Sequence, residues 1–288
     1  MEIASRSPWQ DAWQRLCKNR MALACGALFL LISMFSFVGP LAAKALLGVD
    51  GKTQDVLLGA APPSWRHWLG TDALGRDLLV RAMDGGRIAI SVGLLAAGIA
   101  LLIGVTWGAV AAYVGGKVDE VMMRIVDAMY SLPSTLFVIV VMAMFETRSI
   151  YWLFGLIGAV SWLTMARIVR GQVLSLRHRE FVEAARALGV PPLRIIVGHV
   201  IPNTLGPVIV YTTLTIPGVM LQEAFLSFLG LGVQAPRASW GTLVAEGAQQ
   251  MLVYPWILLG PGLLMTVTIL CLNFLGDGLR DALDPQAR

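Results

Sequence analysis

Six long apolar stretches limit what this chain can fold into. A helix needs about 20 mostly apolar residues to cross the hydrocarbon core of a bilayer, and each stretch approaches that length. The stretches are continuously apolar and lack the two-residue alternation of barrel strands, which favours helices over a β-barrel. Only 14% of the residues are charged, against about 25% in ordinary soluble domains. We therefore expect an all-α membrane protein with six transmembrane helices, at residues 21–43, 88–113, 128–146, 150–167, 204–228 and 255–276.

The first stretch has an alternative interpretation as a cleaved signal peptide, because basic residues precede it and small residues follow it. Its apolar part is longer than the roughly 7–15 residues of a signal peptide. We therefore expect residues 21–43 to be an uncleaved span.

The lysine and arginine residues predict the orientation of the spans. With the N-terminus in the cytoplasm, most of the 22 basic residues fall in cytoplasmic segments, as the positive-inside rule requires. Residues 1–20 and 277–288 are then cytoplasmic, and residues 44–87 form an extracytoplasmic loop. The arginines of that loop oppose this orientation, but the loop is long and also carries several aspartates. The short link between the third and fourth stretches predicts an antiparallel helical hairpin.

Catalytic and metal-binding chemistry has no candidate in the sequence. The three histidines, His67, His178 and His199, fall in separate segments without the spacing of metal ligands. No nucleophile motif is present, and the segment YVGGKVDE lacks both the first glycine and the final Ser or Thr of a phosphate-binding loop. We expect no enzyme activity, no bound metal and no cofactor in this chain, and its basic residues do not build a nucleic-acid-binding face.

A charged, alanine-rich segment at residues 180–203 separates the fourth and fifth stretches. The pattern predicts one helix over residues 170–189. Its apolar stripe would consist of Phe181, Ala184 or Ala185, and Leu188. Gly189 and the following proline pair end that helix, and a second short helix leads back to the membrane. The segment is either a fixed elbow that docks another protein or an amphipathic loop on the lipid headgroups, and the Gly-Pro-Pro corner favours the elbow.

The motif Glu183-Ala184-Ala185, followed by Gly189 and Pro202, resembles the EAA loop in permease subunits of bacterial ABC importers. The general pattern of that family has an isoleucine ten positions after the glycine. This chain has His199 there, and its HVIPN segment is similar to the peptide-importing branch of the family. Further segments resemble C-type subunits of that branch, in the same order, and SWLTMARIVRGQ is most similar to its oligopeptide-importing members. These segments are residues 69–90, 225–241 and 276–285.

The resemblance implies a type I ABC importer permease fold with six transmembrane helices, in which residues 88–276 form the importer transmembrane domain. The EAA loop, about residues 172–203, would be a cytoplasmic coupling-helix elbow that docks on an ATP-binding subunit. The residues that the resemblance assigns to this coupling are Glu180, Glu183, Ala184, Ala185, Arg186, Gly189, His199, Pro202 and Asn203.

The resemblance also implies partners and a function. A second, B-type permease subunit would complete the translocation path, two ATP-binding subunits would hold ATP and Mg²⁺, and an extracytoplasmic binding protein would deliver oligopeptides. Alternating access in the bacterial inner membrane would then import the peptide. Import of dipeptides, nickel or glutathione-like solutes on the same scaffold is an alternative. A stand-alone secondary transporter is the alternative from another class, but such proteins carry internal repeats and several buried ionisable groups.

Within the fifth stretch, Glu223 is a carboxylate at membrane depth, which costs about 2.5–3.5 kcal/mol at the centre of a span on insertion scales. One interpretation is that Glu223 and Gln222 line the peptide path. The other, which we favour, is that Glu223 accepts hydrogen bonds from a neighbouring helix or loop. In the same stretch, Pro217 and Gly218 predict a kink, with a functional hinge as the alternative.

Residues 70–87 of the extracytoplasmic loop combine apolar leucines with charges at helical spacing. They predict an amphipathic helix at the membrane interface. On this helix Arg76 and Asp77 would pair with Arg81 and Asp84. Contact with the binding protein is the alternative role for this segment.

Overall fold

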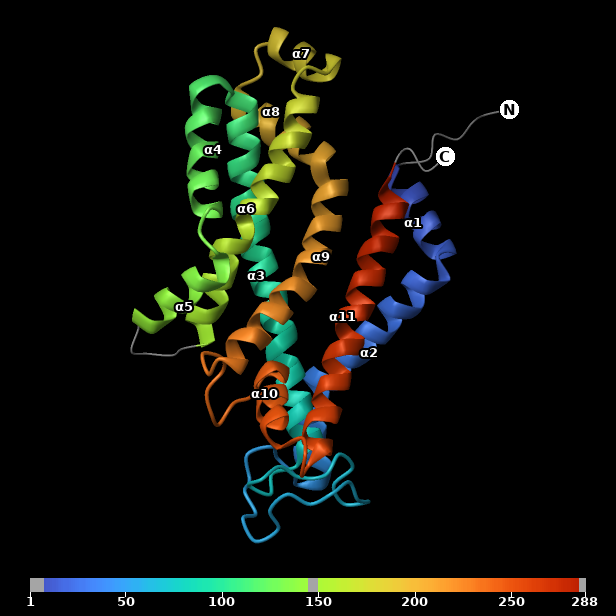
Figure 1. The fold of residues 1–288 in the computed structure, drawn as a ribbon. Helices are drawn as coiled ribbons and strands as arrows, with labels where there is room; N and C mark the ends of the chain where they lie inside the picture. The colour runs from blue at the N-terminus through green and yellow to red at the C-terminus, as the bar shows by residue number, and fades with distance from the viewer. Residues whose placement is uncertain (1–7, 145–149, 285–288) are drawn as a thin grey trace, which may run out of the picture.

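The computed structural model describes residues 8–144 and 150–284, and within these ranges every named element of secondary structure is a helix (Figure 1). This confirms the predicted all-α class. Five helices in these described ranges are long and apolar enough to cross a membrane. They are α2 (Arg20–Ala42), α3 (Leu78–Val114), α6 (Ile150–Leu176), α9 (Ile201–Phe228) and α11 (Pro255–Leu283). A sixth crossing comes from a bent pair, α4 (Gly116–Tyr130) and α5 (Ser134–Met144).

Successive crossings run in alternate directions between two ends of the molecule (Figure 1). The elbow end carries the short helix α7 (Glu180–Ala187), and the loop end carries the irregular residues 48–77. Helix α1 (Pro8–Lys18) packs against the last turns of α11 at the elbow end, where Arg15 donates a hydrogen bond to the Asp284 carbonyl at 3.0 Å. Because the described chain starts and finishes at the same end, the number of crossings is even, and α4 with α5 counts as one.

The third crossing differs from the predicted straight helix over residues 128–146. Helix α4 begins at Gly116, and the break before α5 bends the pair by 78°. Pro133 lies in this break, and proline disfavours helical backbone in the residue before it. The stretch is apolar enough to cross the membrane as predicted, but it forms two helices with a break between them rather than one continuous helix. The predicted hairpin link falls largely on residues 145–149, outside the described residues.

Of the interfacial helix predicted over residues 70–87, only residues 78–87 are helical, as the first turns of α3. Residues 70–77 form a loop in which Asp72 Oδ1 accepts hydrogen bonds from the backbone N–H groups of Leu74 and Arg76. Asp77 then caps α3 by accepting from Val80 N at 3.0 Å. From that cap α3 runs for 37 residues without a break. At 1.5 Å per residue this is about 55 Å, well beyond the roughly 30 Å hydrocarbon core, so the helix projects out of it.

Helices α3 and α6 form the centre of the bundle, and small residues let them approach closely. Gly104 and Gly108 of α3 face α6, and a Cβ atom added at Gly108 would lie 2.3 Å from the Ala166 carbonyl oxygen. Two glycines four residues apart are a common interface in membranes, where helices associate through close packing rather than exclusion of water. This contact holds α3 in place. One end of α3 adjoins the loop end of the molecule, and its other end packs against the elbow.

Helix α10 (Trp240–Gln250) packs beside α9 and α11 towards the loop end (Figure 1). Ser239 and Thr242 cap its first turn reciprocally. The fully buried Trp240 donates from its indole nitrogen to the Ala82 carbonyl of α3 at 2.7 Å. A hydrogen-bonded indole buried in this way fixes α10 against the outer part of α3.

Candidate functional site

The EAA segment forms an elbow at one end of the bundle (Figure 1). Helix α6 ends at Leu176, and α7 starts only after an extended residue, Arg179. The short helix α8 (Pro192–Ile195) and a π-helical turn, Ile196–Val200, then lead into α9. The two-helix elbow is therefore present, but the single predicted helix over residues 170–189 is interrupted at residues 177–179.

Helix α7 is anchored by one face and exposed on the other. Val182 and Ala185 are buried in a cluster with Ala109, Ala112 and Tyr113 of α3. The predicted apolar stripe is thus only partly correct. Ala185 is buried, whereas Phe181 is 42% exposed and Leu188 is 83% exposed. The other face of α7 therefore exposes apolar side chains, which is typical of a surface that contacts another molecule.

Gly189 makes the corner between α7 and α8. Its φ of +74° lies in the left-handed region, which side chains with a Cβ rarely adopt. The Gly189 N–H bonds to the Arg186 carbonyl at 2.9 Å, and the Val190 N–H bonds to the Ala185 carbonyl at 3.1 Å. This is the Schellman pattern of a helix C-terminus. Pro192 then starts α8 at a position where its missing N–H is not needed.

Most residues assigned to coupling lie on the surface of the elbow. Ala185 is the buried exception. The exposed ones are Glu180, Glu183, Ala184, Arg186, Gly189, His199, Pro202 and Asn203. The structure places these residues together at one end of the molecule, and their role in coupling stays a prediction.

Arg186 has a contact that local sequence patterns did not predict. Its guanidinium lies 4.8 Å from the centre of the Tyr113 ring, and its Nε is 3.3 Å from the Tyr113 hydroxyl. Tyr113 is in the last turn of α3, 73 residues earlier in the chain. Arg186 thus fastens the elbow to the end of α3, because a guanidinium is attracted to the face of an aromatic ring.

An ion pair and a hydrogen bond brace the helices beneath the elbow. Arg170 of α6 makes a bidentate pair with Asp119 of α4, at 2.6 and 2.7 Å. Arg177 donates to the Ala112 carbonyl of α3 at 3.0 Å. These contacts join α3, α4 and α6 at the point where the elbow leaves the bundle. A displacement of the elbow would therefore act on three helices together.

Glu223 belongs to α9, is 1% exposed, and faces the start of α10. Its Oε1 atom accepts hydrogen bonds from the Ser227 hydroxyl at 2.7 Å and from the Ser239 hydroxyl at 2.6 Å. These bonds support the structural interpretation of Glu223. The adjacent Gln222 points elsewhere and lines a groove described below. Pro217 is buried in α9, which continues past it, and the role of Pro217 and Gly218 as a hinge stays a prediction.

We expect Glu223→Ala to destabilise the packing of α10 on α9. The substitution removes the acceptor of two buried hydroxyl donors, and an unsatisfied buried group costs about 1–3 kcal/mol. Glu223→Gln keeps the accepting oxygen and should retain most of the stability. Thermal unfolding of the purified variants measures the difference. Equal unfolding midpoints for both variants would contradict this role for Glu223.

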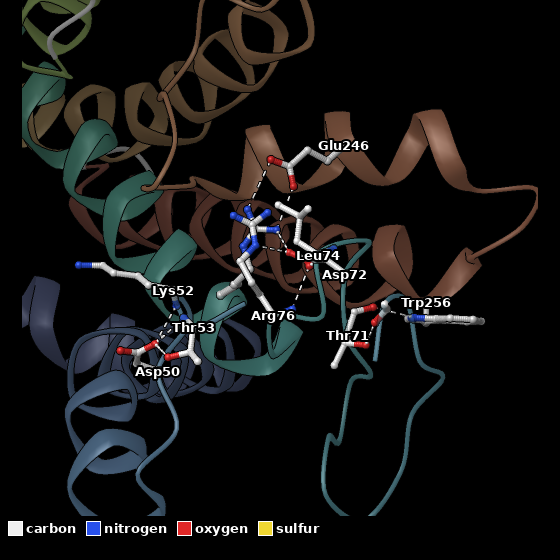
Figure 2. A network of polar contacts seen from close by, with 11 residues as sticks. Asp50, Lys52, Thr53, Thr71, Asp72, Leu74, Arg76, Glu246 and Trp256 are labelled. Carbon is white, nitrogen blue, oxygen red and sulfur yellow. Dashed lines mark hydrogen bonds and ion pairs between the residues drawn. The ribbon is translucent and has the colours of Figure 1, made fainter. Parts of the chain in front are cut away.

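A buried ionic cluster holds the loop end together (Figure 2). Asp72 Oδ2 accepts from Arg76 Nε at 2.6 Å and also pairs with Arg81 of α3. Arg81 Nη1 reaches Glu246 of α10 at 3.0 Å. In the same loop, Thr71 offers its carbonyl to the Trp256 indole at 3.2 Å. The predicted pairing of Arg76 and Asp77 with Arg81 and Asp84 is wrong, because Arg76 and Asp77 lie in the loop before α3, and both Arg76 and Arg81 pair with Asp72 instead.

A groove of about 450 Å³ opens between the α4–α5 bend, α6 and α9. Its volume is within the usual 300–1,000 Å³ of small-ligand sites. The side chains that line it are apolar, hydroxyl-bearing or amide-bearing, and none is charged. Among the described residues, no group of three or more His, Cys, Asp or Glu side chains is placed to hold a metal ion.

The fold and the elbow together define a class: a helical membrane domain with a docking element projecting from one end. Residues 104–288 match the family described as "Binding-protein-dependent transport system inner membrane component". Residues 7–63 match the "N-terminal TM domain of oligopeptide transport permease C". The chain therefore belongs to the family of inner membrane components of binding-protein-dependent transport systems, and it is an integral inner membrane protein of the permease type.

The chain is similar over its whole length to individual members of that family. It is 47% identical to the oligopeptide transport system permease protein OppC of Haemophilus influenzae, over 100% of this chain and 92% of the relative. It is 46% identical to OppC of Escherichia coli K12, over 100% and 94%. It is 44% identical to the dipeptide transport system permease protein DppC of Bacillus subtilis, over 99% and 88%. These relatives confirm the predicted resemblance to C-type subunits of the peptide branch.

Proposed function

We propose that this chain is the C-type permease subunit of an ATP-driven importer of oligopeptides. The observation that carries the proposal is the 47% identity to an oligopeptide permease along the whole chain. The geometry of the elbow supports it, because an importer that uses a separate ATPase needs a rigid contact between the two. Dipeptides are the second candidate substrate, on the strength of 44% identity to a dipeptide permease.

In this proposal the elbow end is cytoplasmic, and so are both termini. ATP and Mg²⁺ belong to two partner subunits, and this chain contributes no catalytic residue. Phe181, Leu188 and Leu193 offer the apolar part of the docking surface, with 42%, 83% and 71% of each side chain exposed. Glu180, Glu183 and the other exposed elbow residues surround them with charge and polarity, which orients a partner.

Alternating access follows from the way the elbow is fastened. Nucleotide binding changes the separation of the ATPases, and the elbow, held by Val182, Ala185 and Arg186, moves with them. A coupling of this kind requires two arrangements of the membrane helices, each favoured by one nucleotide state. The Arg170–Asp119 ion pair and the hydrogen bond from Arg177 to Ala112, which join α3, α4 and α6, pass the displacement to the bundle as one unit. The binding protein delivers peptide at the loop end, and a second permease chain of B type completes the path.

Co-purification from native membranes in mild detergent, with mass spectrometry of every retained chain, tests this proposal. We expect two P-loop ATPases, a second six-span permease and a peptide-binding protein. Peptide bound to that protein would identify the substrate class and distinguish oligopeptides from dipeptides. A chain that repeatedly purifies alone and stable would contradict the importer proposal and favour a stand-alone secondary transporter.

A further inference from the structure

Helix α1 has an apolar side and a polar side. At about 100° per residue, Trp9, Trp13 and Cys17 follow one another along one side of the helix, next to Ala12 and Leu16. An apolar helix side is covered by protein or by lipid, because leaving it in water is unfavourable. The amide and charged side chains share the other side, and they are Gln10, Asp11, Gln14, Arg15 and Lys18.

The described part of the chain covers only part of the apolar side of α1. Ala12 and Leu16 are buried, and Leu16 packs in a cluster with Ala282 of α11. Trp9 and Trp13 are 50% and 64% exposed. Tryptophan is enriched at the boundary between membrane and water, where its ring lies in the apolar region and its N–H reaches the polar one. The two tryptophans therefore favour the membrane boundary as the surface that this side of α1 contacts.

The neighbours of α1 place it at the depth of the lipid headgroups. Helix α11 has 29 residues, about 44 Å at 1.5 Å per residue, and is longer than the roughly 30 Å hydrocarbon core. Its last turn, which carries Arg280 and Ala282, lies outside that core, and α1 packs beside it (Figure 1). The residue after α1, Asn19, is extended and caps α2, whose span begins at Arg20. Helix α1 therefore lies where a membrane span starts.

Two cations lie at this boundary. Lys18 is the last residue of α1 and Arg20 is the first residue of α2, and both side chains are exposed. Neither forms an ion pair with another residue in the described ranges. Arg15 is not counted with them, because its guanidinium bonds the carbonyl of Asp284. Asp11, the acidic residue of α1, is seven positions before Lys18, about 10 Å along the helix.

The acidic side chains near the end of α11 point away from these cations. Asp277 and Asp281 are exposed, and they lie about 140° and 100° around α11 from Ala282, the residue that packs with α1. Positive charge therefore dominates on the α1 side of the boundary. A surface of this kind attracts anionic phospholipids, and each Lys or Arg near the membrane strengthens that attraction.

We infer that α1 anchors this end of the bundle to the membrane surface and binds an anionic phospholipid. Trp9 and Trp13 enter the boundary between headgroups and acyl chains, and Lys18 and Arg20 contact the lipid phosphate. Lipid is favoured over a partner protein, because the tryptophans and the two cations lie directly at the start of a span, where the bilayer begins. The orientation in the proposed function makes this the cytoplasmic leaflet, but the inference does not depend on which substrate the chain transports.

The first experiment measures how deep α1 lies in the membrane. The complex in which the chain purifies is placed in vesicles of equal parts phosphatidylcholine and phosphatidylglycerol. Cys25→Ala and Cys271→Ala leave the exposed Cys17 as the single cysteine of this chain, and a nitroxide spin label is attached there. Cysteines of any co-purifying chain are replaced in the same way. The matched sample carries the label at Gln14→Cys, on the polar side of α1, with Cys17→Ala.

We expect oxygen, which concentrates in the bilayer, to relax the Cys17 label more than a water-soluble nickel chelate does, and the reverse for the label at Gln14→Cys. A Cys17 label that responds chiefly to the nickel chelate would show that this side of α1 faces water. A label shielded from both reagents would show that a protein covers it. Either result overturns the inference, and neither bears on transport, so the proposed function is tested separately by co-purification.

The second experiment tests the lipid contact directly. Photoactivatable phosphatidylglycerol, with its reactive group near the headgroup, is included in the same vesicles, and its attachment to residues 9–20 is quantified by mass spectrometry. We expect Lys18→Gln together with Arg20→Gln to reduce attachment by roughly fivefold for each charge removed. Arg124→Gln removes an exposed cation of α4 and should leave attachment to residues 9–20 unchanged.

Attachment that is unchanged in the double variant would overturn the inference. The same holds if unlabelled phosphatidylcholine competes as well as unlabelled phosphatidylglycerol. Competition is measured on the unmodified chain, so the test remains decisive even if the double variant fails to insert.

Discussion

Gly189→Val should abolish peptide uptake and association with the ATPases, while leaving the chain inserted in the membrane at its normal level. A β-branched residue at a φ of +74° is strained by about 1–2 kcal/mol or more, so the corner between α7 and α8 must change. A Cβ at this position would meet nothing within 4 Å, so crowding within the chain is not the cause. Uptake, membrane abundance and ATPase co-purification are measured together.

Gly171→Val is the matched control for that variant. Its added Cβ also meets nothing within 4 Å, but Gly171 lies inside α6 with an ordinary helical backbone. Transport by Gly171→Val should therefore persist. Normal uptake by Gly189→Val at equal abundance would rule out the elbow as the coupling element.

Charge reversal tests the same surface without touching its backbone. Glu183 is exposed in the first turn of α7, where a carboxylate is stabilised by the helix dipole. Glu183→Lys should have little effect on the fold of the chain and should still eliminate ATPase association and uptake. Asp277→Lys reverses an exposed charge on α11 outside the elbow and serves as the control. Equal loss in both variants would indicate a general effect of charge rather than docking through α7.

Asp72→Ala should produce the largest loss of stability among single substitutions at the loop end. Asp72 is 5% exposed and Arg81 is 3% exposed, so removal of the carboxylate leaves a buried guanidinium without its main partner. Breaking a buried ion pair from one side typically costs about 3–5 kcal/mol. For a chain of this size we expect the thermal unfolding midpoint in detergent to fall by on the order of 10 °C.

Asp50→Ala provides the comparison within the same loop. Asp50 accepts hydrogen bonds from Thr53 and Lys52, and these bonds hold the pKa of its carboxyl below the usual value, but the side chain is at the surface. Because water can replace those bonds, the midpoint should move far less than in Asp72→Ala. Similar midpoints for the two variants would contradict the role of the buried cluster in stabilising the loop end.

Features that depend on neighbouring residues could be predicted from the amino-acid sequence. Apolar stretches of membrane-spanning length predict spans because the bilayer has a fixed thickness, whatever the rest of the chain does. The elbow was equally predictable, because a glycine stop followed by prolines ends one helix and starts another through local backbone sterics. The EAA motif and its spacing predicted the family to which the chain belongs, and the comparisons confirm that family.

The contacts that hold those elements together depend on the packed fold and could not be predicted. Arg186 meets Tyr113 across 73 positions, and Arg81 meets Glu246 across 165. The spacing of residues within one segment does not show which distant segment it will contact. For that reason the sequence analysis paired Arg81 with charges on its own predicted helix rather than with Glu246. Likewise, Asp72 bonds its own loop backbone, so the helix predicted over residues 70–87 begins only at Leu78. Burial and hydrogen bonding are properties of the packed chain, so no local pattern of residues could predict these contacts.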